Sequence, residues 1–127
     1  MSLFNICTYN VRSSSDINEH ALDTMLSESK FFKWDVIGLC ETKIKEAEIS
    51  ETVEGHLLFT AGNGVTRRNG VGFLVHQSII RYIESFENYS DRLCKITLKL
   101  KECKIVLVQV YMPTSTSSDQ DVEKIYH

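Results

Sequence analysis

The sequence of 127 residues lacks the features that mark several specialised classes of protein. It has a single proline and no low-complexity tract, which argues against disorder as the resting state. No apolar run approaches the ~18 residues that a membrane-spanning helix needs, so we expect no contact with a membrane. The first residues show no charged segment followed by an apolar one, and a secretory signal is therefore not predicted.

Positive charge is also in short supply. Lys and Arg number 14 against 17 Asp and Glu, which gives a formal net charge of −3. Any contact with nucleic acid must therefore come from local basic groups or from a bridging cation. The four cysteines form no C-x-x-C pair, and the histidines do not supply the spacing of a zinc site. We expect buried free thiols in a reducing, intracellular compartment.

The apolar pattern predicts one α/β domain with two layers, a largely antiparallel sheet and one long early helix. Hydrophobic residues make up 43% of the chain, enough for a core. Residues 18–32 have near-helical apolar spacing, whereas 43–54 are charged and predict a loop with a turn of helix. Residues 62–70 have the glycines and asparagines of a hairpin connection. The predicted strands are residues 3–9, 35–40, 57–61, 71–76, 80–86, 93–100 and 105–111.

A helix signal stands close to the end of the chain. Ser117 or Ser118 followed by Asp121 resembles a capping box, which predicts that a helix begins there. That helix has run only about two turns at His127. We therefore expect residues 1–127 to be a truncated domain; the alternative is a short docked C-terminal helix.

Three predicted strands end in polar residues that handle metal and phosphate. These residues are Asn10, Glu41 and Tyr111. In open α/β sheets, ligands bind outside strand ends, where an amide, a carboxylate and a phenol could together hold a hard cation and a phosphate oxygen. Each residue also has a structural explanation: a turn-forming Asn, a surface Glu, and a Tyr that closes the core.

Five motifs then recur in an order that resembles a known superfamily. The order is similar to the N-terminal half of the endonuclease/exonuclease/phosphatase superfamily, over essentially the whole chain. Within it, the motifs are most similar to the apurinic-endonuclease-like, reverse-transcriptase-associated domain of non-LTR retrotransposons, of RTE type, and their craniofacial-development-protein relatives. The motifs are Thr8-Tyr9-Asn10-Val11-Arg12, Asp35-Val36-Ile37-Gly38-Leu39-Cys40-Glu41-Thr42, Gly70-Val71-Gly72-Phe73-Leu74-Val75, Ser90-Asp91-Arg92 and Val110-Tyr111-Met112-Pro113.

This resemblance implies the first half of a four-layer, DNase I-like α/β sandwich that hydrolyses phosphodiesters with Mg²⁺ or Mn²⁺. It implies that Asn10 orders the active site and phosphate, that Glu41 binds the cation, and that Tyr111 contacts the scissile phosphate or polarises the surroundings of the nucleophile. Arg92 occupies the family's Ser-Asp-Arg position and could face the phosphate, a weaker transfer. Arg67 and Arg68 could contact the DNA backbone, or form a solvated hairpin tip.

The departure from the family is large. The family's Gly-Asp-x-Asn motif and its terminal Asp-His pair, which activates water, are absent from the 127 residues. The resemblance therefore implies a fragment of a DNA endonuclease that is inactive by itself, binds DNA only within a complete domain, and is nuclear if it functions. His127 matches no motif, and we assign it no catalytic role.

Two alternatives stay open. The chain could be a non-catalytic remnant or interaction module that self-associates through an uncovered sheet face. It could also belong to a superfamily phosphatase with a substrate other than DNA, because the fold does not settle the substrate.

Overall fold

Two β-sheets make up most of the fold. The computed structural model describes residues 4–11, 18–66 and 69–112. The larger sheet has five strands in the order β1-β2-β5-β4-β3, with β1 parallel to β2 and every other pair antiparallel. Its strands are β1 (Ile6–Asn10), β2 (Val36–Cys40), β3 (Glu48–Glu51), β4 (Leu57–Ala61) and β5 (Val71–Val75).

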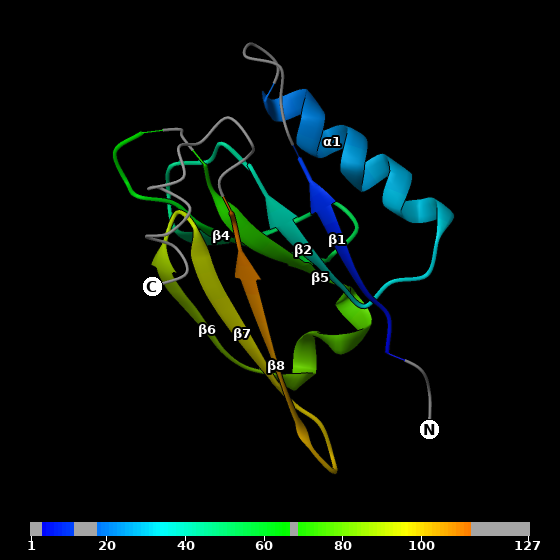
Figure 1. Ribbon diagram of the computed structural model, residues 1–127. Helices are drawn as coiled ribbons and strands as arrows, with labels where there is room; N and C mark the ends of the chain where they lie inside the picture. Colours follow the sequence, from blue (N-terminus) through cyan, green and yellow to red (C-terminus); the bar gives the residue numbers. More distant parts are fainter. Residues whose placement is uncertain (1–3, 12–17, 67–68, 113–127) are drawn as a thin grey trace.

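The smaller sheet is antiparallel and lies against one face of the larger one (Figure 1). Its three strands are β6 (Ile83–Ser90), β7 (Leu93–Lys99) and β8 (Lys104–Val110). The helix α1 (Asn18–Glu28) covers the opposite face of the larger sheet and continues into a 3₁₀ turn, η1 (Ser29–Phe31). A second 3₁₀ segment, η2 (Gln77–Tyr82), joins β5 to β6.

The interior strand β2, between β1 and β5, has the short, continuous apolar run of a strand that is buried on both faces. Val36 points into the core between the two sheets, where it packs with residues of β5 and β7. Ile37 and Leu39 point to the other side, where they pack with Met25 of α1 and with Trp34. Both faces of β2 are therefore buried, as its sequence predicted.

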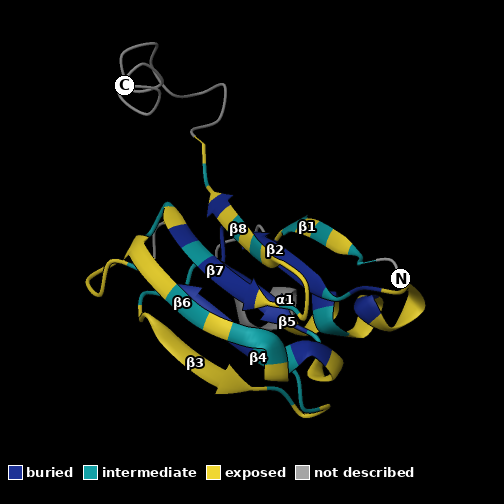
Figure 2. Ribbon diagram, turned by 90° about the horizontal axis from the view of Figure 1, so that it is seen from below, coloured by how far each residue is buried: buried dark blue, intermediate teal, exposed yellow. Residues whose placement is uncertain are grey.

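The outer face of the smaller sheet is open. Along β8, the inward residues Ile105 and Leu107 pack on the core, while alternate valines face outward. Val106, Val108 and Val110 are 53%, 54% and 41% exposed. Figure 2 shows this alternation of buried and exposed positions along the sheet. The described residues thus form three layers, helix, sheet and sheet.

The expected α/β class is confirmed in broad terms, with strands more abundant than expected. The four-layer sandwich that the resemblance implies goes beyond the three layers seen in the described residues. The predicted helix after Ser117 lies outside them. Within them, no helix is both long and apolar enough to cross a bilayer.

Two segment predictions are wrong. Residues 43–54 contain the edge strand β3, whose four residues are all exposed. This strand exists because β4 pairs with it, with Thr60 Oγ1 accepting from the Glu48 N–H and donating to the Glu46 carbonyl. Residues 80–86 were expected to be one short strand, but η2 occupies the first part and β6 begins at Ile83.

The four cysteines are free, as expected, but they are not uniformly buried. Cys94 is fully buried in the core, and burial raises the pKa of its thiol to about 12. Cys7 and Cys40 are half-buried, and Cys103 is exposed in the turn between β7 and β8. The prediction of burial failed for Cys103 because that residue follows the apolar pattern of β7 instead of lying within it.

Candidate functional site

The ends of β1, β2 and β8 meet at one edge of the molecule. Because β1 and β2 are parallel and in register, Asn10 is paired with Cys40, and Glu41 is the next residue along. Tyr111 directly follows β8 in the second sheet. The Tyr111 hydroxyl donates a hydrogen bond of 2.9 Å to Glu41 Oε1. Two side chains 70 residues apart in the sequence are therefore joined at the predicted position.

Glu41 is held in an unusual state. Only 9% of its surface is exposed, and its backbone is left-handed, with φ of 54°. A non-glycine residue in that region is strained, and such strain persists only where the surroundings enforce it. Here the next two residues are fixed by backbone hydrogen bonds, from the Thr42 N–H to the Gly70 carbonyl (3.1 Å) and from the Lys43 N–H to the Asn69 carbonyl (3.0 Å).

Asp91 forms hydrogen bonds with the loop before β5, and that loop in turn binds the two residues after Glu41. Its Oδ2 accepts hydrogen bonds from the side-chain amides of Asn63 (3.0 Å) and Asn69 (3.1 Å). Its carbonyl accepts from the Gly70 N–H (2.9 Å). Asp91 belongs to the Ser90-Asp91-Arg92 motif, but no role was predicted for it. The available signal was a carboxylate together with a hairpin loop rich in asparagine.

Tyr111 is kept as a hydrogen-bond donor. Burial, the hydrogen bond to Glu41 and the negative charge of Glu41 all raise the pKa of its phenol, while the positive charge of Arg92 lowers it. The backbone also joins these residues, because the Tyr111 N–H donates to the Arg92 carbonyl over 2.9 Å. Arg92 thus lies near enough to act on the phenol electrostatically.

The buried side-chain amide of Gln109 contacts Cys40, the residue that precedes Glu41. Gln109 of β8 is buried, and its Nε2 donates to Cys40 Sγ over 2.7 Å. A side chain at Gly38 would clash with the Gln109 amide oxygen, so the glycine leaves the space that Gln109 fills. Sequence reasoning missed Gln109, although a lone polar residue in the most apolar strand was the available signal.

The structure brings together part of the predicted site. Glu41 and Tyr111 are in contact, and Arg92 is their neighbour. Asn10 lies at the same sheet edge with an exposed side chain, so its role in ordering the site stays a prediction. Arg67 and Arg68 lie outside the described residues.

The donor chemistry at this edge fits one ligand of a hard cation. Mg²⁺ prefers oxygen ligands, keeps several waters and is held by one or two carboxylates, and Glu41 supplies one. No group of three or more His, Cys, Asp and Glu side chains that could hold a metal ion occurs among residues 4–11, 18–66 and 69–112. Among the described residues, this edge therefore offers one carboxylate that could ligate a cation and no complete metal site.

The fold and this site define an α/β domain of two stacked sheets with a buried carboxylate–phenol pair at the strand ends. No family model matches the chain. Over 122 residues, 95% of the chain, it is 28% identical to craniofacial development protein 2 of Bos taurus. Over the same length it is 27% identical to craniofacial development protein 2 of Tragulus javanicus. The chain spans 20% of the length of each of these curated relatives. This distant similarity agrees with the relatives that the motifs indicated.

Proposed function

We propose that this chain supplies part of the metal and phosphate site of a divalent-metal-dependent DNA endonuclease of retrotransposon origin, within the endonuclease/exonuclease/phosphatase superfamily. The observation that carries the proposal is the 2.9 Å hydrogen bond between Tyr111 and the buried, backbone-strained Glu41. The order of motifs along the chain and the distant similarity to craniofacial development protein 2 support it.

Each residue has a distinct part in the proposed chemistry. Glu41 would hold Mg²⁺ or Mn²⁺, and the bound cation would supply positive charge against the phosphate and a more acidic water. Tyr111 stays protonated and donates its single O–H to Glu41 Oε1 in this structure, and it would contact a phosphate oxygen only by exchanging that bond once Glu41 holds the cation. Arg92 adds positive charge beside the phenol, and Asn10 has the donors and the acceptor needed to orient a phosphate oxygen.

The residues that activate water in this superfamily are missing from the chain. Its 127 residues contain no Gly-Asp-x-Asn motif and no Asp-His pair. No residue is therefore assigned to activate the attacking water, and we expect cation binding without DNA cleavage. In a full domain, DNA would be the substrate.

Cation binding at Glu41 and DNA cleavage can be measured separately. Substoichiometric Mn²⁺ is added to the ¹⁵N-labelled chain, and paramagnetic broadening of the amide signals is mapped. Broadening should centre on the amides near Glu41, including Val71 and Tyr111, and should disappear in Glu41→Gln. A matched control, Glu48→Gln, removes an exposed carboxylate from β3 and should leave the broadening intact.

The second readout is cleavage. Plasmid, nicked and abasic DNA incubated with the chain and Mg²⁺ should show no cutting above that of Glu41→Ala. The proposed metal site is wrong if Mn²⁺ broadens the same amides in Glu41→Gln as in the unmodified chain. Cutting that depends on Glu41 would instead show that the chain needs no further residues to activate water.

A second candidate function is that of an interaction module. The observation in its favour is the open outer face of β8, where three valines are exposed. Contiguous apolar surface of this kind marks interaction sites in soluble proteins. We propose that this face allows self-association, which does not require catalysis.

A further inference from the structure

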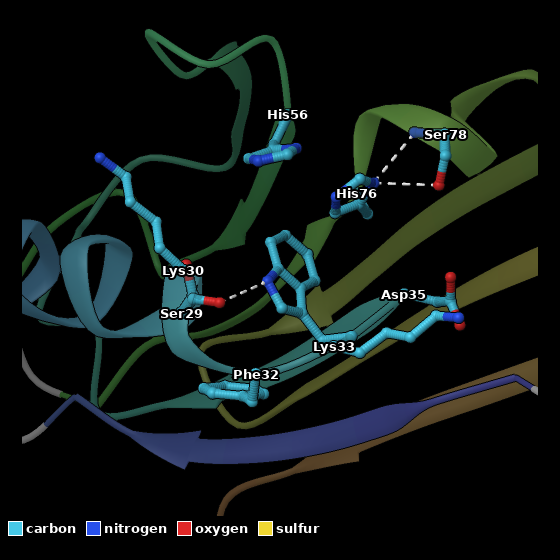
Figure 3. Close-up of a pocket in the computed structure, with 9 residues that line it drawn as sticks. Ser29, Lys30, Phe32, Lys33, Asp35, His56, His76 and Ser78 are labelled. Carbon is cyan, nitrogen blue, oxygen red and sulfur yellow. Dashed lines mark hydrogen bonds between the residues drawn. The ribbon is translucent and has the colours of Figure 1, made fainter.

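A pocket of about 340 Å³ lies at the opposite end of the larger sheet from Glu41. It is built around the start of β2, where Trp34 and Asp35 precede the strand. His76 directly follows β5, whose last residue pairs with the first of β2, and His56 directly precedes β4. The volume is at the lower end of the range found for small-molecule sites. Figure 3 shows the residues that line this pocket.

Three aromatic rings pack against one another in the pocket. The His56 and His76 ring centroids are 4.5 Å apart, and each lies 4.9 Å from that of Trp34. The indole N–H is already committed to the Ser29 carbonyl over 3.1 Å. Of the three rings, only the two imidazoles therefore have a polar group left to offer a ligand.

Backbone hydrogen bonds fix which nitrogen of each imidazole carries the proton. His56 Nδ1 accepts from the Gln77 N–H over 3.0 Å, and His76 Nδ1 accepts from the Ser78 N–H over 3.1 Å. A backbone N–H can only donate, so both Nδ1 atoms must be unprotonated. Each neutral ring then carries its proton on Nε2 and presents a donor there.

This tautomer disfavours a cation and favours an anion. An Nε2 that carries a proton cannot ligate a metal, and protonating Nδ1 would oppose the two backbone donors. Burial and the neighbouring His76 lower the pKa of His56, while Glu54 raises it. His56 therefore stays a neutral Nε2–H donor at neutral pH.

Lys30 supplies positive charge on the His56 side of the pocket, whereas the Lys33 side chain runs toward Asp35 (Figure 3). Lys30 and Lys33 both line the pocket, and no described residue forms an ion pair with Lys33. Lys30 is paired with Glu54 over 3.5 Å, but both side chains are largely exposed, so the pair is weak. The carboxylate of Asp35 opposes an anion, yet it accepts the Asn5 N–H over 2.7 Å. In Figure 3, Asp35 and Lys30 lie at opposite sides of the pocket, with His56 on the Lys30 side.

We propose that this pocket is a binding site for a small oxyanion, a phosphate or carboxylate group, held by the Nε2–H groups of His56 and His76, with the ammonium group of Lys30 adding positive charge from the His56 side. Hydrogen bonds to an ionised acceptor are the stronger class, and the two Nε2–H groups belong to rings whose centroids are 4.5 Å apart. The inference does not rest on the proposed nuclease function, because none of these residues belongs to the Glu41 site.

The single tryptophan of the chain makes the site measurable. Trp34 is the only tryptophan and lines the pocket, so its fluorescence reports on occupancy. Inorganic phosphate and acetate are titrated separately into the full chain, with sodium chloride keeping the ionic strength constant. We expect a saturable change with phosphate. Saturation by acetate as well would extend the site to carboxylates.

Four variants decide the outcome. Lys30→Met and His56→Asn should each weaken binding by about fivefold or more, since each removes one donor. Asn keeps an oxygen that can accept the Gln77 N–H but has no group in place of Nε2–H. Glu54→Gln should tighten binding because it frees Lys30. Lys99→Met, an exposed lysine on β7 outside the pocket, should change nothing.

The proposal is overturned if neither anion saturates the signal, or if Lys30→Met and Lys99→Met bind phosphate equally well. It is also overturned if ¹⁵N NMR shows the proton of the neutral His56 or His76 ring on Nδ1. If His56→Asn does not fold, the comparison of Lys30→Met, Glu54→Gln and Lys99→Met decides. Glu41→Gln should bind phosphate at this pocket like the unmodified chain, which separates this result from any failure of the proposed nuclease site.

Discussion

Glu41 combines two conditions that proteins normally avoid. Its carboxylate is buried, and its backbone occupies the left-handed region that a glycine would adopt without strain. Strain of this kind costs about 1–3 kcal/mol. A residue that served stability alone would be expected to relieve it. The combination therefore supports the proposal that Glu41 has a chemical role.

The titration of Tyr111 tests how strongly Glu41 acts on its partner. In Glu41→Gln the negative charge is lost, so the pKa of Tyr111 should fall, though not fully to 10.0, because burial also raises it. In the unmodified chain, a folded pKa above the unfolded one means that stability is lost as pH rises above 10. Tyrosine ¹³Cζ NMR measures the titration. Glu48→Gln is the control, and an equal pKa in both variants would contradict the electrostatic link.

At the scale of single residues, the sequence predicted that Glu41 and Tyr111 meet, but it did not predict the hydrogen bonds of Asp91 that hold the neighbouring loops. Glu41 and Tyr111 could be predicted because strand ends are visible in the apolar pattern and carry unusual polar residues. The supporting bonds of Asp91 to Asn63 and Asn69 depend on how two loops fold over each other. No local pattern encodes such a meeting, so these partners could be found only from the structure.

Among the elements, strands with their own apolar pattern were predicted within a few residues. The strands β2, β4, β5, β7 and β8 all show it, because burial selects their side chains. The edge strand β3 has no such pattern, since all its residues are exposed and its ladder with β4 alone defines it. The start of β6 was misplaced because His76 caps a 3₁₀ segment that an apolar run conceals.

The loop before β5 offers a sharp test of backbone geometry. Gly70 has a φ of 93°, and an added Cβ would clash with Thr42 Oγ1. Gly70→Ala should therefore lower the free energy of unfolding by about 2 kcal/mol or more, from backbone strain plus the clash. Gly64 is the matched control, because its φ is 80° but nothing lies within 4 Å of an added Cβ.

Urea denaturation measures both glycine variants. Gly64→Ala should lower the free energy of unfolding only by the cost of placing an alanine at positive φ, about 1 kcal/mol. Because Gly70 sits against the Thr42 and Lys43 backbone, Gly70→Ala should also weaken Mn²⁺ binding at Glu41. Equal destabilisation by the two substitutions would show that the contact with Thr42 has no energetic weight.

At the scale of the whole molecule, the three layers are unequal. The larger sheet is covered on one face by α1 and on the other by the smaller sheet, whereas the smaller sheet is open on its outer side in the described part of the chain (Figure 2). The sequence predicted the buried side of β8 but not how exposed its other side is. A run of valines looks the same whether one face or both are covered.

Self-association through the open face should be detectable by size-exclusion chromatography with light scattering. At high concentration the unmodified chain should contain dimers or larger species. Val106→Lys combined with Val108→Glu should shift it to monomer, because charges replace the exposed apolar surface, and the Glu faces Lys95 across the strands.

Val53→Lys combined with Val65→Glu is the control for this experiment. Both valines are exposed but lie outside the smaller sheet. This variant should associate like the unmodified chain. A strictly monomeric unmodified chain, or equal association by the two double variants, would rule out this face as the contact.

The strand β2 separates two different chemistries. Asp35, at the rim of the His56–His76 pocket, directly precedes it, and Glu41 directly follows it. The extended chain between them covers roughly 20 Å, about two Debye lengths at physiological ionic strength. Charges exposed to solvent at one end are therefore largely screened by salt from those exposed at the other. A change of charge at one end of β2 should therefore leave the electrostatics of the other end nearly unchanged.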